Sequence, residues 1–366
     1  MLRLAAGRTC TQLQERACAA AATQATALTA AAAAGGERRH ASFSSAAAAA
    51  PSVPAGDLRQ SFSYCVSQVK QHDYENYLWV TQLPKELRAA VFALRAFNVE
   101  TALVGEHAKS EMLVLMRCQW WRDAINDCYK GKPPAQPVVT ALAAVLAQRP
   151  LTRYRLQQIV SAREEDLLAA EQPGSLAALE RYADGTAGQL LALQLEAAGV
   201  GSGSGGGGAE SSDGDGISGG GGDPSAVAAA EHAAAHLGKA VGLVGLLRGT
   251  YSHAAHSRVY VPADLCAAHG VSAEDILAGR DSPGMRDVTH AVASAAKQHL
   301  DAARGLVREA PRAVRPLFAP AVAAGMYLDG LEAAGFDLFD QRMLRGGVPQ
   351  LPYQLRLKWA LLRGAY

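Results

Sequence analysis

Apolar residues recur at intervals of three and four along most of the chain after residue 57, which is the spacing of an amphipathic helix. Proline and glycine residues separate these segments, and Asp57 and Ser272 with Asp275 stand where they could begin helices. No segment shows the strict alternation of a half-buried strand. The sequence therefore predicts an all-α fold, with helices over residues 58–72, 85–103, 110–129, 137–147, 153–170, 175–198 and 225–248, a long helix after Pro283 and a last one over 353–362.

Residues 88–127 contain two of these helices, joined by a short break at 104–107. The second helix carries a stripe of apolar residues at four-residue spacing: Met112, Met116, Trp120 and Ala124, with Leu113 beside them. Because residues four apart share one face of a helix, we predict that this stripe packs in the core.

Two other helices contain residues that need an explanation. Gly185 and Gly188 lower the helix propensity of 175–198, and they favour either close helix approach or room for a substrate. His299 lies on the apolar face of the helix after Pro283. It is expected to be a hydrogen-bonded core residue rather than a ligand.

The first 50 residues contain five arginines and two glutamates, and most of the others are Ala, Ser and Thr. Segments rich in Arg and Ser and poor in acids are typical of organelle transit peptides. We predict a mitochondrial presequence over residues 1–44, cleaved near 41–45, and a linker over 45–57. A chloroplast address is the alternative, whereas a secretory signal would need a compact apolar core that is not evident.

The net charge of +1 provides no electrostatic footprint for nucleic acid. No run of 18 strongly apolar residues occurs, so no membrane-spanning helix is predicted, and the surface beyond the presequence is not basic enough to predict firm membrane binding. The six cysteines lack C-x-x-C or metal-ligand spacing, which indicates a reducing compartment. A redox pair of Cys118 and Cys128 is the less favoured alternative.

Residues 199–224 consist almost entirely of Gly, Ser and Asp, with too few apolar residues to offset the entropy of ordering. We predict a disordered insertion within a single helical domain over 58–366. A nucleotide-binding glycine loop is excluded because no strand precedes this segment.

Four strings in the right order and spacing resemble the squalene/phytoene synthase family: residues 92–97 (FALRAF), Tyr182 with 186–188 (TAG), 237–248 (LGKA to LLR) and 258–262 (RVYVP). Further strings resemble the branch of that family that contains assembly factor 6 of mitochondrial respiratory complex I: residues 92–100, 73–78 (DYENYL), 116–121 (MRCQWW), 133–138 (PPAQPV) and 336–339 (FDLF). The resemblance implies the helical isoprenoid-synthase fold over residues 58–366.

Family members that join prenyl diphosphates hold Mg²⁺ with two D-x-x-x-D motifs on facing helices. The resemblance places the first motif at Ala102 and Glu106 and the second at Gly249 and His253. Only one of these four side chains is a carboxylate, and Mg²⁺ requires oxygen ligands. The expectation is therefore a pseudoenzyme with no catalytic residue, no metal and no cofactor.

Two acidic runs could replace the lost carboxylates. Residues 123–127 (DAIND) have D-x-x-x-D spacing but lie beyond the position of the family motif, near a helix end. Residues 164–166 (EED) form the second run. We expect both runs to lie on solvated helix faces.

The resemblance implies a non-catalytic assembly factor for complex I, peripheral to the matrix side of the inner membrane, with subunits or assembly intermediates of the membrane arm as partners. Arg248, Arg258 and Tyr260 could contact an anion or ligand, or could instead make ion pairs and surface contacts. An active prenyl transferase and an isoprenoid- or lipid-binding protein are the alternative functions.

Overall fold

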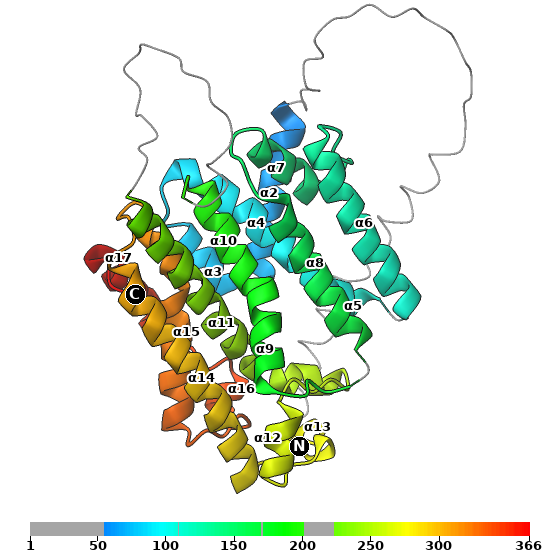
Figure 1. Cartoon of the computed structure of the whole chain (residues 1–366), viewed down its shortest axis with the longest axis vertical. Helices are drawn as coiled ribbons and strands as arrows, with labels where there is room; N and C mark the ends of the chain where they lie inside the picture. Colours follow the sequence, from blue (N-terminus) through cyan, green and yellow to red (C-terminus); the bar gives the residue numbers. More distant parts are fainter. Residues whose placement is uncertain (1–54, 109, 170, 201–222) are drawn as a thin grey trace, which may run out of the picture. The chain divides into compact units, whose positions relative to one another are not determined.

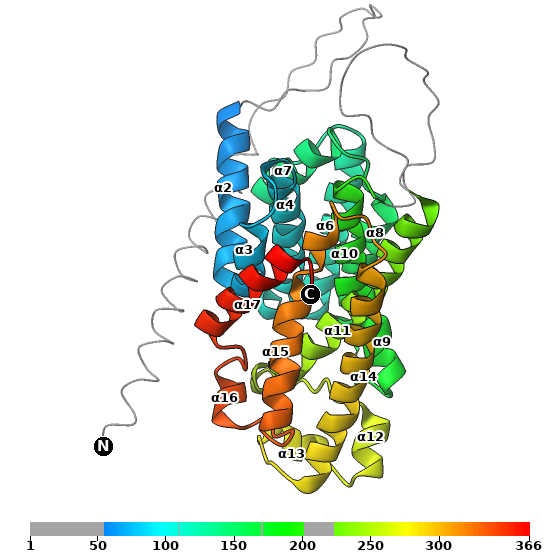
Figure 2. The same cartoon turned by 90° about the vertical axis from the view of Figure 1, so that its left-hand side faces the viewer.

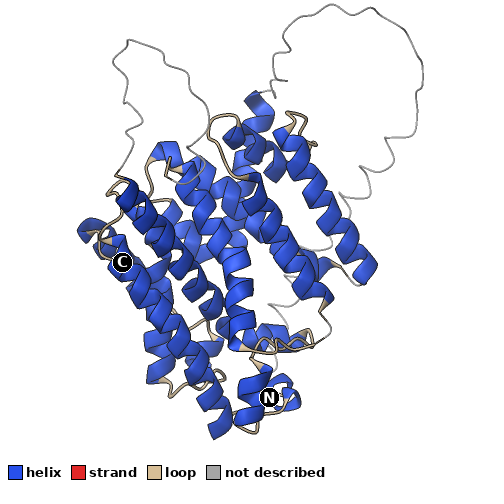
Figure 3. Cartoon of the chain, in the orientation of Figure 1, coloured by secondary structure: helices blue, strands red, loops and turns tan. Residues whose placement is uncertain are grey.

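The structure is a computed structural model that describes residues 55–108, 110–169, 171–200 and 223–366. Helices are the only regular elements within these ranges, which confirms the predicted all-α class (Figure 3). The presequence over 1–44, the linker as far as residue 54 and residues 201–222 of the insertion lie outside the described residues. None of the described helices is both long and apolar enough to cross a membrane.

The elements before the insertion follow one another with short connections (Figure 1). In chain order they are α2 (Ala55–His72), α3 (Tyr74–Val80), α4 (Lys85–Ala102), α5 (Val104–His107), α6 (Glu111–Tyr129), α7 (Pro137–Leu146), α8 (Arg153–Leu168), α9 (Leu176–Ala183), the π-helical turn η1 (Asp184–Gly188) and α10 (Gln189–Ala197). Helix α4 packs against α2, α7 and α10, and α6 packs against α8. Gly131 follows the end of α6 and Pro150 follows the end of α7 as predicted, whereas no helix was predicted at α3.

The elements after the insertion are arranged around one long helix, α11. In chain order they are α11 (Pro224–Ala255), α12 (Ala263–Ala268), α13 (Ala273–Leu277), α14 (Pro283–Val307), the 3₁₀ turn η3 (Arg315–Phe318), α15 (Pro320–Ala333), α16 (Gln341–Leu344) and α17 (Gln350–Arg363). Helix α11 contacts α14, α9, η1, α10 and α15 (Figure 1). It therefore connects the segments before and after the insertion.

Several helix boundaries differ from the prediction. Helix α2 begins at Ala55, so Asp57 lies in its first turn instead of capping it. The expected break at 104–107 is a single helical turn, α5. Helix α11 continues past Arg248 to Ala255 because its packing against neighbouring helices outweighs the low propensity of its glycines. The start at Ser272 is confirmed, since Ser272 and Asp275 form a reciprocal capping box.

The glycines of the predicted 175–198 helix permit close helix approach. The chain does not break there but widens into the π-turn η1 between α9 and α10. A Cβ atom added to Gly238 of α11 would lie 2.3 Å from the Cα atom of Gly188, and one added to Gly242 would lie 2.4 Å from the Cβ atom of Ala183. Side chains at these positions would force the two segments apart.

The predicted core stripe of α6 is wrong for every residue except Ala124. Met112 is 66% exposed, Met116 is 60% exposed, and Trp120 and Leu113 are also exposed. The buried face consists of smaller or differently spaced residues: Val114, Cys118, Trp121, Ala124, Ile125 and Cys128. Both faces of α6 are apolar, so periodicity alone could not identify the one that packs against α7 and α8.

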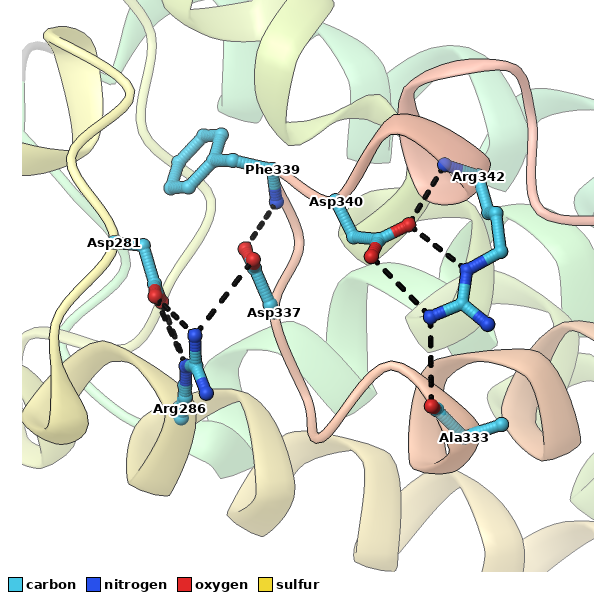
Figure 4. A network of polar contacts seen from close by, with 7 residues as sticks. All are labelled: Asp281, Arg286, Ala333, Asp337, Phe339, Asp340 and Arg342. Atoms are coloured by element: carbon cyan, nitrogen blue, oxygen red, sulfur yellow. Dashed lines mark hydrogen bonds and ion pairs between the residues drawn. The ribbon is translucent and has the colours of Figure 1, made fainter.

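A polar network joins the beginning of α14 to the loop after α15 (Figure 4). Arg286 pairs with Asp281 and lies 3.8 Å from the carboxylate of Asp337, which in turn accepts a hydrogen bond from the backbone N–H of Phe339. Asp340 accepts hydrogen bonds from Arg342 at the start of α16. The string at 336–339 therefore contributes to the contact between the loop after α15 and the beginning of α14.

Candidate functional site

A cavity of about 530 Å³, the main cavity, lies among α3, α4, α9, η1, α10 and α11. Its wall combines apolar side chains with charged ones: His72, Asp73, Asn76, Arg95, Asn98, Val99, Ala102, Leu103, Glu106, Arg163, Tyr182, Thr186, Ala187, Leu190, Leu191, Val241, Gly242, Gly245, Leu246, His253 and Pro320. A space of this size and mixed lining is typical of a small-molecule site.

The α3–α4 side of the main cavity is organised by the buried guanidinium of Arg95. It donates a 2.8 Å hydrogen bond to Asp73, whose carboxylate also accepts one of 2.6 Å from Asn76. The Arg95 guanidinium carbon lies 5.1 Å from the ring centroid of Trp79. Burial lowers the pKa of Arg95, and the nearby Asp73 opposes this shift. Both oxygens of the Asp73 carboxylate therefore already accept hydrogen bonds from side chains of the protein.

Arg163 of α8 is a second buried cation in the cavity wall. Its guanidinium donates a 2.7 Å hydrogen bond to the side-chain oxygen of Asn98. No hydrogen-bond partner for its Nε atom exists among the described residues. Burial lowers the pKa of this arginine, and its unpaired Nε–H is available to donate a hydrogen bond to an anionic or oxygen-bearing ligand.

A smaller cavity of about 250 Å³, the side cavity, shares Ala102, Glu106, Arg163, Tyr182 and His253 with the main one.

The floor of the side cavity is a network around Asp166. Tyr260 donates a 2.6 Å hydrogen bond to Asp166, and Arg258 donates to the backbone oxygens of Asp166 and Leu167. Burial raises the pKa of Asp166, and the Tyr260 hydrogen bond and Arg258 oppose that effect.

The prediction that residues 164–166 form a solvated run is wrong for two of the three acids. Glu164 pairs with Arg122 of α6, and its side chain is largely buried, as is that of Asp166. Only Glu165 is exposed. The other acidic run behaves as expected: Asp123 is exposed and accepts a hydrogen bond from Gln119, and Asp127 pairs with Lys130.

His253 lies where the two cavities meet, and its ring centroid is 4.5 Å from that of Tyr260. Its Nδ1 atom has no hydrogen-bond partner among the described residues. Burial, with smaller contributions from His256 and Arg258, lowers the pKa of His253 to about 4. The imidazole is therefore neutral at physiological pH.

The low pKa of His253 predicts a specific acid sensitivity. Between pH 6.5 and 4 the unfolded chain binds a proton at this position that the folded chain does not bind, so the free energy of unfolding falls as pH falls. We expect His253→Gln to remove about 2 kcal/mol of the loss between pH 7 and 4.5, measured by urea unfolding. Identical pH profiles for the two proteins would contradict this.

Three of the four positions that the resemblance assigned to the motifs lie together, because Ala102, Glu106 and His253 line both cavities. Gly249 does not belong to either lining, and a Cβ atom placed there would lie 2.3 Å from the His253 ring.

Two of the three candidate anion contacts, Arg258 and Tyr260, line the side cavity. The third, Arg248, lines neither cavity, since it makes two 2.8 Å hydrogen bonds to Glu75. That result favours the ion-pair interpretation for Arg248.

Sequence reasoning missed the two buried arginines of the site, Arg163 and Arg95, and the pairing of Arg95 with Asp73. Arg95 lies within the 92–97 string and Asp73 opens the 73–78 string, so both were visible as parts of motifs. Arg163 gave no local signal, because its partner Asn98 lies 65 residues away.

The residues present do not fit the polynuclear Mg²⁺ site of the prenyl synthases. Three acidic residues line the two cavities. Asp73 accepts a hydrogen bond from Arg95, and Asp166 accepts one from Tyr260. Glu106 is the remaining carboxylate in the linings. Nowhere in the described parts of the chain do three or more His, Cys, Asp or Glu residues gather closely enough to hold a metal ion.

The family model for squalene/phytoene synthase matches residues 69–351. The chain belongs to the squalene/phytoene synthase family. Within the family, the chain is similar to NADH dehydrogenase (ubiquinone) complex I, assembly factor 6, from Bos taurus, with 36% identity over 282 residues, 77% of each chain. The Drosophila melanogaster homolog of that factor is 36% identical over 307 residues, 82% of this chain and 84% of the relative. Phytoene synthase from Thermus thermophilus is 30% identical over 75% of this chain and 84% of the relative.

Solved structures of the squalene/phytoene synthase type share the fold. A dehydrosqualene synthase in complex with ligand superposes with a TM-score of 0.66 at 18% identity, covering 85% of this chain and all of that one (100%). A squalene synthase from Alicyclobacillus acidocaldarius gives 0.61 at 19% identity, covering 78% and 97%. The predicted isoprenoid-synthase-like fold is confirmed.

Proposed function

We propose that this protein is a non-catalytic assembly factor for mitochondrial respiratory complex I. The observation that carries the proposal is its 36% identity, over about three quarters of both chains, to a relative named complex I assembly factor 6. The same relationship extends to the fly homolog. We further propose that the protein works on the matrix side of the inner membrane, peripherally attached, with subunits or intermediates of the membrane arm as partners.

We infer the absence of catalysis from the side chains at the positions that the resemblance assigns to the metal motifs. Ala102 and Gly249 offer no side-chain ligand atom, and a neutral imidazole at His253 is a poor ligand for Mg²⁺. Without several carboxylates, the chain cannot hold the metal ions that neutralise a departing diphosphate. Incubation with farnesyl or geranylgeranyl diphosphate and Mg²⁺ should give no condensed product, and a condensed product would reject the non-catalytic assignment.

An assembly role needs a surface for a protein partner, and we assign it to the outer face of α6, formed by Met112, Leu113, Leu115, Met116 and Trp120. Methionines adapt to the shape of a partner, and exposed apolar patches mark interaction sites. Glu111, Arg117 and Asp123 on the same helix give the surroundings mixed charge, which suits a protein surface.

Complementation of a knockout tests the assembly role and this surface together. The native chain should restore assembled complex I on native gels, and so should Glu106→Gln, because that carboxylate serves no chemistry in the proposal. The double variant Met112→Asp, Met116→Asp should reduce assembled complex I several-fold, since about 1–3 kcal/mol per residue is typical of contacts in an interface centre.

The control is Tyr154→Asp, which introduces one Asp at a 65% exposed aromatic residue of α8, outside the proposed surface. It should complement fully. Normal complex I in the knockout itself would reject the assembly role. Full activity of the α6 double variant would reject only the surface, and a severe loss with Glu106→Gln would restore a chemical role for the cavity.

A second candidate function is binding of an isoprenoid or lipid with an anionic group. The observation that favours it is the unpaired Nε atom of buried Arg163 in the wall of a 530 Å³ cavity. Native mass spectrometry with metal-free farnesyl diphosphate should show a complex that Arg163→Met weakens. No retained ligand, or equal retention by the variant, would exclude this role for the cavity.

A further inference from the structure

Helix α17 is apolar on two opposite faces, and only one of them packs against the protein. Tyr353, Leu357 and Ala360 are buried. The outward residues are Leu351 (68% exposed), Leu355 (63%), Trp359 (58%) and Leu362 (83%). At 3.6 residues per turn these four form one stripe opposite the buried face, which we call the outer face of α17.

Basic residues border the outer face of α17 on both sides. Lys358 lies on one flank, and Arg356 and Arg363 lie on the other, as the helical spacing requires. Residues 341–366 contain five Lys and Arg and no Asp or Glu, although the whole chain has a net charge of only +1. The positive charge is thus concentrated in this terminal segment.

The protein does little to neutralise this charge. Arg356 lies 3.5 Å from Asp329 in an exposed pair, and the Arg363 guanidinium stacks 4.1 Å from the centroid of Trp359. Within the described ranges, no acidic side chain forms an ion pair with Lys358 or Arg363. The flanks are therefore free to meet an anionic surface.

Helix α17 is fixed by contacts within the chain itself. It packs against α15, and the Tyr353 hydroxyl donates a 3.1 Å hydrogen bond to the backbone oxygen of Glu75 in α3 (Figure 2). Gly364, in the left-handed region at φ 63°, ends the helix. Binding would consequently require little ordering of this segment.

We propose that the outer face of α17 docks the protein onto an anionic lipid surface. Leu and Trp side chains enter the headgroup region while the flanking Lys and Arg contact lipid phosphates, which is how interfacial amphipathic helices bind. Trp is favoured at that boundary. The inference rests on the membrane attachment in the proposed function and names the element responsible. Firm membrane binding was not predicted from the sequence, because the surface beyond the presequence is not basic overall.

The outer face of α6 lacks the basic border that would suit lipid, since Glu111 and Asp123 lie on that helix. In Figure 1, α6 and α17 lie at opposite edges of the group of described helices. A membrane at α17 would therefore leave α6 accessible to a protein partner.

Quenching of tryptophan fluorescence by brominated lipids tests the proposal on the full chain. The four tryptophans are Trp79, Trp120, Trp121 and Trp359, and of these only Trp120 and Trp359 are exposed. Vesicles of brominated phosphatidylcholine with cardiolipin should quench the native protein, and Trp359→Phe should lose the quenching. Trp120→Phe should keep it. The basic segment before residue 55 contains no tryptophan, so its own vesicle binding would not mimic this result.

Vesicle flotation measures the contributions of the two parts of the face. Leu355→Asn with Leu362→Asn should weaken binding about tenfold or more by removing inserted apolar surface. Neutralising Arg356, Lys358 and Arg363 to Gln should weaken it by roughly fivefold per charge on cardiolipin vesicles and much less on pure phosphatidylcholine. Met116→Asn on α6 is the matched control and should bind like the native chain, and circular dichroism checks that each variant is folded.

Absence of quenching would overturn the proposal. Quenching that survives in Trp359→Phe and disappears in Trp120→Phe would also overturn it and assign lipid contact to α6. Failure of the assembly role is separable, because vesicle binding requires no complex I. If the Leu355→Asn, Leu362→Asn variant loses vesicle binding but still restores complex I, the proposed membrane attachment is rejected while the lipid affinity of α17 stands.

Discussion

Replacing Gly238 by alanine is expected to lower the free energy of unfolding by about 3 kcal/mol, the upper range for overpacking a well-packed interior. Gly238 lies where α11 crosses η1. A Cβ atom there would lie 2.3 Å from the Cα atom and 2.6 Å from the backbone nitrogen of Gly188. Because both atoms belong to the backbone, no side-chain rotation can relieve the clash, and the two segments must separate.

The matched control for this substitution lies on the same helix. An added Cβ atom at Gly245 meets no atom within 4 Å, so Gly245→Ala should gain up to about 1 kcal/mol from helix propensity. Denaturant unfolding should therefore show that the two substitutions change the free energy of unfolding in opposite directions. Equal stability of Gly238→Ala and the native chain would show that α11 and η1 do not approach as closely as the structure indicates.

The second large effect is expected at Asp73. Asp73→Ala removes the carboxylate that pairs with buried Arg95 and accepts the hydrogen bond of Asn76. An uncompensated buried charge is strongly destabilising, so we expect a loss of about 3 kcal/mol in the free energy of unfolding. Removing the charge as well, in Asp73→Ala with Arg95→Met, should recover a large part of that loss, as a double-mutant cycle would show.

The exposed pair of Arg356 with Asp329 provides the control for this prediction. Asp329→Ala breaks the same kind of ion pair where water solvates both partners, so stability should hardly change. If Asp73→Ala were as mild as Asp329→Ala, or if adding Arg95→Met made the protein less stable still, the Arg95–Asp73 pair would not be an organising element of the cavity wall.

Local signals in the sequence located most of the long helices, although not α3 or α15. The side chain of Ser110, where the 110–129 helix was predicted to begin, accepts a hydrogen bond at the start of α6, and Ser272 with Asp275 caps α13 as predicted. Such signals act over three or four residues, so they can be recognised from the sequence without knowledge of the tertiary structure. The family strings were equally local and predicted the fold correctly, and three of the positions that the resemblance assigned to the motifs, Ala102, Glu106 and His253, line one cavity.

The pairing of charges could not be read in the same way. Arg248 binds Glu75, 173 residues away, and Arg163 binds Asn98, 65 residues away. Asp166 was expected in solvent, yet it accepts a hydrogen bond from Tyr260. A charged side chain is solvated, paired or buried according to what the rest of the chain places beside it, and helical spacing contains no information about that.

The sequence by itself determined that this protein is helical, where most helices begin and end, and to which family it belongs. Only the tertiary structure decided which face of α6 and of α17 is covered. Each helix has two apolar faces, and periodicity assigns both the same character. Helices α7 and α8 cover one face of α6, which leaves Met112, Met116 and Trp120 exposed. Helix α15 covers one face of α17, which leaves Leu355, Trp359 and Leu362 exposed. The surfaces proposed for partner and membrane are therefore products of packing, because burial depends on all the elements that meet at a helix and not on the helix alone.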